Sequence, residues 1–105
     1  MNYFPVFLET ENELNKILRK QKKTKEEIAI LFTSLWDPAS KELVHRITAP
    51  YVSESLPTLF IVDSFTMPHA FVIYKTTKLP HMVKLKKRGV ESEDYLPNIY
   101  RALGI

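Results

Sequence analysis

Apolar positions along the chain follow two patterns, short continuous runs and stripes at helical spacing. Continuous runs at residues 28–32 and 58–62 are typical of strands covered by helices on both faces. Stripes that repeat every three or four residues predict helices between the strands. In order, the pattern predicts strands at residues 3–8, 28–32, 58–62, 82–86 and 90–95, with helices after the first, second, third and fifth.

Capping signals predict where the first two helices begin. Thr10 and Glu13 have capping-box spacing, and the apolar stripe that follows indicates a helix that runs out within residues 19–25, whose last part is a loop. Asp37 and Pro38 predict an N-cap and a first helical residue, because the carboxylate accepts free amide protons and proline lacks a donor that would go unused. The inward residues are expected to be Leu14, Ile17 and Leu18 in the first helix, and Leu43, Val44 and Ile47 in the second.

Prolines and glycines place the remaining boundaries. Pro5 suits an edge strand, because it has no amide proton to donate to a neighbour. Pro50 is expected to end or kink the second helix near Ala49, since its ring removes a hydrogen bond and clashes with the preceding turn. Pro97 is expected to begin the last helix and Gly104 to end it.

Charges support a hairpin near the C-terminus. With Arg88-Gly89 as a tight turn, Lys86 faces Glu91 and Lys84 faces Glu93 across the two strands. Opposite charges placed directly across a strand pair contribute roughly 0.2 to 1 kcal/mol each, so they favour this pairing where the apolar pattern is weak.

Composition limits the class of protein. The chain has 105 residues, of which 45% are apolar and 26% charged, as expected for one globular domain over residues 1–105. It contains no cysteine, which excludes disulfides, thiolate metal sites and cysteine nucleophiles. The N-terminus has no basic leader before an apolar core, and no apolar run approaches the ~20 residues that cross a bilayer. We therefore expect a soluble, cytoplasmic monomer.

The predicted order of elements is similar to the thioredoxin fold over essentially the whole chain. Three stretches carry the resemblance. The first stretch, residues 31–36 with Lys41, resembles the strand end, tryptophan and lysine around a thioredoxin active-site loop. The second, Val62-Asp63 with Pro68 and Tyr74, resembles the next strand-to-helix passage. The third, Leu79-Pro80, resembles the family's residue pair whose proline is cis. The resemblance implies an α/β fold with a mixed sheet of four to five strands flanked by helices on both faces.

The chain departs from the thioredoxin pattern at the reaction centre. Asp37 and Ser40 stand where the family has two cysteines, and Leu31 stands at its buried acid. Without a thiolate, thiol-disulfide exchange has no nucleophile. His45 replaces a helix proline, and residues 89–96 form a shorter segment than usual, so a vestigial last strand is expected. Residues 36–38 are also similar to the spliceosomal thioredoxin-like proteins, which are non-redox scaffolds.

The resemblance implies a binding groove rather than a catalytic site. In the family the cis proline exposes backbone groups that pair with an extended peptide. We expect a protein or extended peptide to bind here, with no cofactor and no catalysis. The groove residues are expected to be Trp36, Asp37, Pro38, Ser40, Leu79, Pro80 and His81.

Three alternatives remain from the residues themselves. A hydrolase triad of Asp37, Ser40 and His81 is disfavoured, because Asp37 is better explained as a helix cap and no glycine-rich loop supplies an oxyanion hole. The three histidines lack the spacing of a metal site. The net charge of +3 leaves a nucleic-acid or ribonucleoprotein accessory role as the second hypothesis. Its basic patch would consist of Lys22, Lys23, Lys86, Lys87 and Arg88.

Overall fold

The elements follow the predicted order. The computed structural model describes residues 1–48, 53–76 and 78–105. The described strands are β1 (Phe4–Phe7), β2 (Ile28–Thr33), β3 (Thr58–Asp63), β4 (His81–Lys86) and β5 (Gly89–Tyr95). The helices are α1 (Glu11–Thr24), α2 (Pro38–Thr48), α3 (Pro68–Ile73) and α4 (Asn98–Leu103). Pro50 and Ala49, which were expected to end α2, lie outside the described residues.

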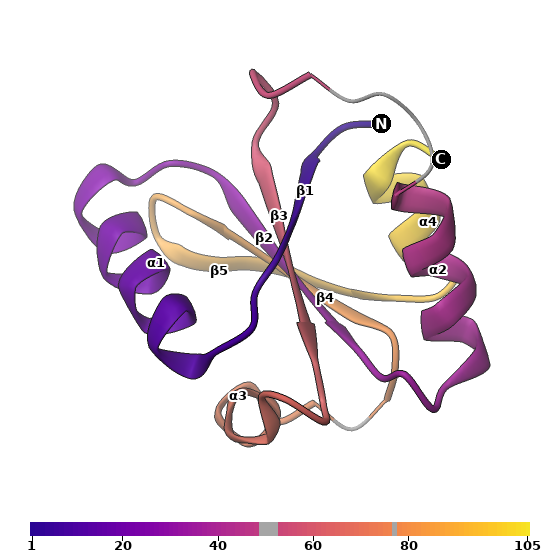
Figure 1. Ribbon diagram of the computed structural model, residues 1–105. Coiled ribbons are helices and arrows are strands. Elements are labelled where there is room, and N and C mark those ends of the chain that lie inside the picture. The colour runs from indigo at the N-terminus through magenta and orange to yellow at the C-terminus, as the bar shows by residue number, and fades with distance from the viewer. Residues whose placement is uncertain (49–52, 77) are drawn as a thin grey trace.

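The strands form one mixed sheet in the order β1-β3-β2-β4-β5. β1, β3 and β2 run parallel, whereas β4 pairs antiparallel with β2 and β5 antiparallel with β4. Figure 1 shows α1 and α3 on one face of the sheet and α2 and α4 on the other. The predicted α/β fold, with helices on both faces, is confirmed.

Each face of the sheet has its own apolar core, and β2 contributes to both. All six of its residues are buried, as its continuous apolar pattern predicted. Since side chains alternate along a strand, Leu31 packs with α2 and α4 while Phe32 packs with α1 and α3. Leu43 and Ile47 of α2 and Leu14 of α1 are buried as predicted.

β1 lies at the edge of the sheet, as Pro5 indicated. The amides of Phe4 and Leu8 donate to carbonyls on the β3 side, at 2.8 and 3.0 Å. Because amides alternate in direction along a strand, the amide position of Pro5 faces the free edge. Proline therefore removes a donor where a foreign strand would pair.

α1 is longer than the sequence predicted. The Thr10 cap is confirmed, since its hydroxyl oxygen accepts the Glu13 amide at 3.3 Å. The helix continues to Thr24, however, and Lys25 ends it in the left-handed conformation (φ 60°). The expected loop is wrong because Gln21 is buried there. Its amide nitrogen donates to the carbonyls of Glu26 and Lys86, at 3.1 and 3.0 Å.

The β4–β5 hairpin forms, but its predicted register is wrong. Gly89 lies opposite Lys86, so the turn residues are Lys87 and Arg88 rather than Arg88-Gly89. Gly89 adopts a φ of 92°, which favours glycine. A shift in register between Lys84 and Leu85 then places Ser92 opposite Lys84. The opposite charges were therefore not directly across from each other, although Lys86 still reaches the carboxylate of Glu91 at 3.4 Å.

The end of the chain differs from the prediction in two further details. β5 spans Gly89–Tyr95 and pairs with β4 along its length except at Glu91, where the register shifts, so the expectation of a vestigial strand is wrong. Pro97 is the N-cap of α4 rather than its first residue, and Gly104 ends the helix as predicted. The Leu79-Pro80 peptide bond is cis, as the resemblance implied, and Leu96-Pro97 is cis as well.

No helix in the described part of the chain is long and apolar enough to cross a membrane.

Candidate functional site

Asp37 caps α2 as predicted. One oxygen of its carboxylate accepts hydrogen bonds from the Ser40 amide, at 2.9 Å, and from the Ser40 hydroxyl, at 2.7 Å. The pair that replaces the two cysteines of thioredoxins therefore forms a closed capping unit, in which the Ser40 side chain is fully buried. This geometry stabilises the start of a helix, and the Ser40 hydroxyl is buried and engaged in the cap.

His81 lies on the opposite face of the sheet from Ser40. It is at the start of β4, and its ring stacks on Phe32 and Tyr95 with centroid distances of 5.6 and 4.6 Å. Phe32 belongs to the core beneath α1 and α3, whereas Ser40 is on α2. The sheet therefore separates His81 from Asp37 and Ser40, which gives a structural reason against the hydrolase alternative.

The ring nitrogens of His81 have different surroundings. Nδ1 is 3.0 Å from the Thr76 hydroxyl, and Nε2 is buried without a hydrogen-bond partner, 3.6 Å from the Glu93 carboxylate. Burial lowers the pKa of His81, because it disfavours the charged ring, while Glu93 and Asp94 act in the opposite direction. The residue is thus a neutral part of the core.

Large apolar side chains are exposed where the three parallel strands end. Phe7 is the last residue of β1, Leu35 and Trp36 lie after β2, and Phe65 lies after β3. The exposed fractions are 51%, 60%, 83% and 74%, respectively. Together these four residues form what we call the apolar end of the molecule. Exposed apolar side chains gathered in one place are typical of interaction sites.

Asp63 holds the loops of the apolar end in place. Its two carboxylate oxygens accept the backbone amides of Leu35 and Phe65, each at 2.9 Å. This half-buried residue at the end of β3 therefore positions the two loops that present Leu35, Trp36 and Phe65. In the sequence Asp63 stands out only as part of the strand-to-helix passage that resembles thioredoxins, and nothing local indicates that it reaches the loop after β2.

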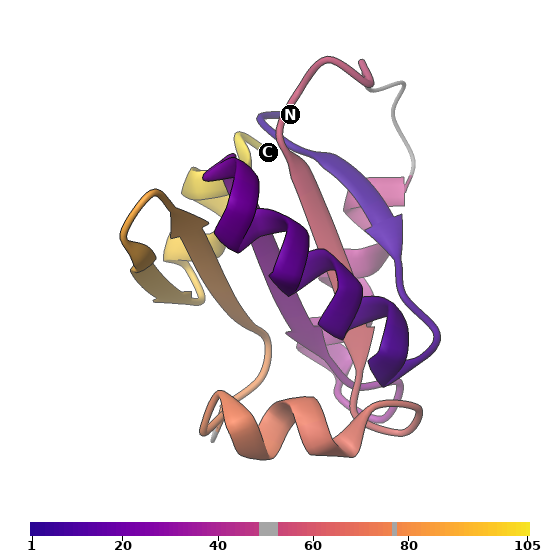
Figure 2. The same cartoon turned by 90° about the vertical axis from the view of Figure 1, so that its left-hand side faces the viewer.

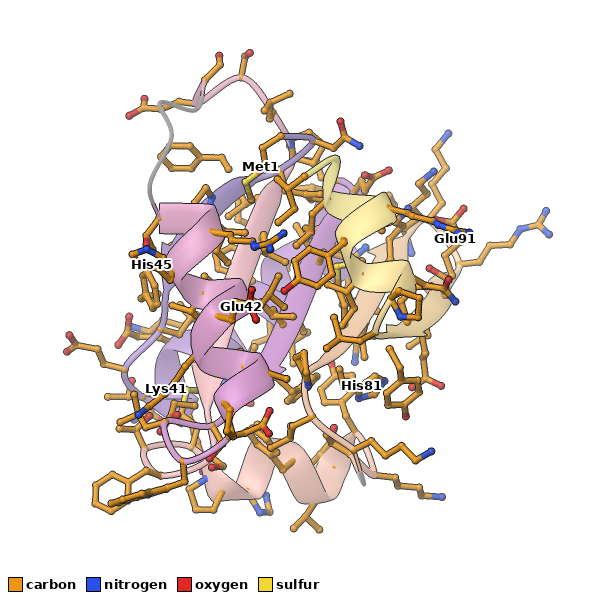
Figure 3. The ribbon with its side chains drawn as sticks, turned by 90° about the vertical axis from the view of Figure 1, so that its right-hand side faces the viewer. Met1, Lys41, Glu42, His45, His81 and Glu91 are labelled. Atoms are coloured by element: carbon orange, nitrogen blue, oxygen red, sulfur yellow. The ribbon has the colours of Figure 1, made fainter. Side chains whose placement is uncertain are left out.

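A cleft of about 540 Å³ adjoins the apolar end, between α2 and the ends of β1 and β3. Phe7, Leu35 and Ile61 are among its apolar lining, and Lys41 and His45 line it from α2. Figure 3 shows these last two side chains on the same side of α2, away from His81. Sequence reasoning missed this cleft, because its walls come from three separate strands and a helix.

The structure separates the predicted groove residues by their accessibility. Trp36 and Pro38 are exposed, and Asp37 and Leu79 are half-buried. Ser40, Pro80 and His81 are buried, so their side chains present little surface to a partner.

The predicted basic residues come together at the other end of the sheet. Gln21 joins the end of α1 to Lys86, which brings Lys22 and Lys23 near the hairpin turn of Lys87 and Arg88 (Figure 2). Lys86 itself is neutralised, with its ammonium 3.2 Å from Glu27 and 3.4 Å from Glu91.

Tyr3 completes this ion-pair network through a 2.9 Å hydrogen bond to Glu27. Partial burial acts to raise the pKa of Glu27, but the bonds from Tyr3 and Lys86 outweigh it and the pKa is lowered. Burial, and then the bond to Glu27, raises the pKa of Tyr3 well above its usual range.

Comparisons with known proteins place the fold. No family model and no curated protein matches the sequence. Among solved structures, the chain is similar to thioredoxin NaTrxh from Nicotiana alata, with a TM-score of 0.78 and 13% identity over 90% of this chain and 83% of that one. It is also similar to Fasciola hepatica thioredoxin, with a TM-score of 0.74 and 17% identity over 93% and 95% of the two chains. Thioredoxin O2 from Arabidopsis thaliana gives a TM-score of 0.73 and 18% identity over 99% and 92%. The chain therefore has a thioredoxin-like fold, and since it contains no cysteine it has no dithiol site.

Proposed function

We propose that the protein is a non-catalytic interaction module that binds an extended segment of another protein at its apolar end. The observation that carries the proposal is that Trp36 and Phe65 are both exposed, in two neighbouring loops of a thioredoxin-like scaffold without cysteine. Asp63 accepts a hydrogen bond from each of the two loops, so the surface is already formed in the unbound protein. A preformed surface loses less conformational entropy on binding.

The chemistry of the surface indicates what kind of segment it binds. Bulky apolar side chains of a partner fit between the exposed rings, and aromatic anchors of this kind dominate many interfaces. Strand addition to β1 is disfavoured by Pro5, so at this edge side-chain contacts contribute more than backbone pairing. Asp37 and Ser40 serve the scaffold by holding the start of α2 in place.

Affinity capture from the source cell, followed by direct binding of the identified partner, tests the proposal. Trp36 is the only tryptophan, so its emission is expected to shift to the blue when a partner covers it. The variants Trp36→Ser and Phe65→Ser are expected to lose capture while keeping their far-UV circular dichroism. Val90→Ser, which changes an exposed apolar residue at the opposite end, is the matched control.

Two results would contradict the proposal. The first is undiminished capture by both apolar-end variants. The second is reduction of insulin disulfides above background by the wild-type protein, because it would require redox chemistry that the absence of sulfur nucleophiles excludes.

A further inference from the structure

A cluster of cations lies at the end of the sheet opposite the apolar end. It joins the C-terminal part of α1 to the β4–β5 turn, two segments about sixty residues apart in the sequence. β2 runs between the two ends, and at about 3.3 Å per residue its six residues separate them by roughly 20 Å. We call the cluster the basic end, and define it as Lys22, Lys23, Lys25, Lys87 and Arg88.

Charge pairing divides the cations of this region into two groups. Lys86 is held by Glu27 and Glu91 and is therefore unavailable to a ligand. Within residues 1–48, 53–76 and 78–105, the five residues of the basic end have no carboxylate within 4 Å. All five are exposed. Glu27 and Glu91 are thus occupied by one lysine, whereas the five cations of the basic end face solvent together with the neighbouring Glu26.

Hydrogen bonds from Gln21 to the backbone fix the two halves of the basic end relative to each other. The buried side chain of Gln21 donates to Lys86 at 3.0 Å and to Glu26 at 3.1 Å, so it ties the helix to the hairpin and to the chain that leaves the helix. Lys25, in the left-handed conformation, turns the chain at this point. Figures 1 and 2 both show the end of α1 beside the hairpin turn.

A cleft of about 570 Å³ lies between these two segments. Its lining includes the cations Lys25, Lys87 and Arg88, the exposed apolar side chain of Val90, and the ion-paired Lys86 with its carboxylate partners Glu27 and Glu91. Gly89 alone has a positive φ in this turn, at 92°, whereas Lys87 and Arg88 do not. This geometry accepts most residue types at the two positions before the glycine, so the turn itself does not require cations at the tip.

We propose that the basic end binds the sugar–phosphate backbone of duplex nucleic acid without reading its sequence. Several unpaired lysines and one arginine match a closely spaced series of phosphates, which dominate the affinity of such complexes. No aromatic side chain belongs to the basic end, so the stacking platform that single strands require is missing from this surface. The proposal does not depend on the apolar end, and a protein bound there leaves the basic end free.

Binding of a fluorescein-labelled 20-base-pair duplex, followed by anisotropy over a range of salt concentrations, tests the proposal. If all five cations contact phosphates, the slope of log K against log salt is about −4.5. In the variant Lys23→Gln/Lys87→Gln/Arg88→Gln the slope falls to about −2. The control Lys41→Gln/Lys75→Gln/Lys78→Gln has the same net charge but removes exposed lysines elsewhere, and it is expected to bind like the wild type.

Three outcomes overturn the proposal. Equal loss in the two triple variants shows attraction to the overall charge rather than to the basic end. Absence of binding to the duplex at low salt excludes nucleic acid. Tighter binding to labelled poly-L-glutamate than to the duplex assigns the surface to an acidic protein instead. None of these results changes the capture experiment at the apolar end, so the two proposals fail separately.

Discussion

Replacement of Gln21 by methionine is expected to destabilise the protein by about 2 to 4 kcal/mol. The substitution keeps the length of the side chain but removes both donated hydrogen bonds, at 3.1 and 3.0 Å. A carbonyl that loses its partner costs roughly 1 kcal/mol where water reaches it and up to roughly 3 where water does not. Both bonds are partly buried, so each carbonyl is expected to cost about 1 to 2 kcal/mol, which gives about 2 to 4 kcal/mol for the two. At about 4 °C per kcal/mol, the melting temperature falls by roughly 8 to 16 °C.

Urea denaturation followed by far-UV circular dichroism measures this loss. Trp36 is too exposed in the folded protein for its fluorescence to report unfolding well. The control is Asn15→Met, an exposed position on the same helix, which is expected to change stability by less than about 0.5 kcal/mol. If the two variants have equal free energies of unfolding, Gln21 does not join α1 to the hairpin as described.

Two other changes test the site. The pKa of His81 is lowered in the folded protein, so below about pH 6.5 the unfolded chain binds a proton that the folded chain does not. The free energy of unfolding should therefore fall as the pH drops below about 6.5, by at most about 1.4 kcal/mol per pH unit. His81→Phe should abolish this dependence between about pH 5.5 and 7, and a slope that persists would place the proton elsewhere. Asp37→Ala removes both bonds to Ser40 and should cost about 0.5 to 2 kcal/mol in urea denaturation, whereas Asp37→Ser, which keeps a capping oxygen, should recover most of it. Equal stability of these two Asp37 variants would refute the capping role.

The sequence was sufficient for features that depend on short-range physics. The apolar run of β2 predicted its central position, because only a strand covered on both faces tolerates six consecutive buried residues. The Asp37 cap and the edge position of Pro5 followed from hydrogen-bonding capacity alone. These predictions required no knowledge of distant partners.

Predictions failed where a distant contact decides the local structure. The end of α1 looked like a charged loop, yet Gln21 finds two carbonyl partners, one of them on β4, and the helix continues past it. The hairpin register depended on the conformation of Gly89, and a single extra residue displaced the expected charge pairs. His81 was assigned to the groove beside Ser40, although alternation along β4 places its ring on the other face.

The two surfaces follow from the direction of the strands. In a parallel sheet the ends of the strands gather on one side. Here the end of β1 and the loops after β2 and β3 present exposed apolar side chains, and Asp63 holds the two loops. The antiparallel β4 reverses this direction, which brings its hairpin to the beginning of β2 and beside the end of α1. Cations from two separate stretches therefore meet about one strand length from Trp36. Because the two ends share no residue, the proposed protein site and the proposed polyanion site are compatible in one molecule.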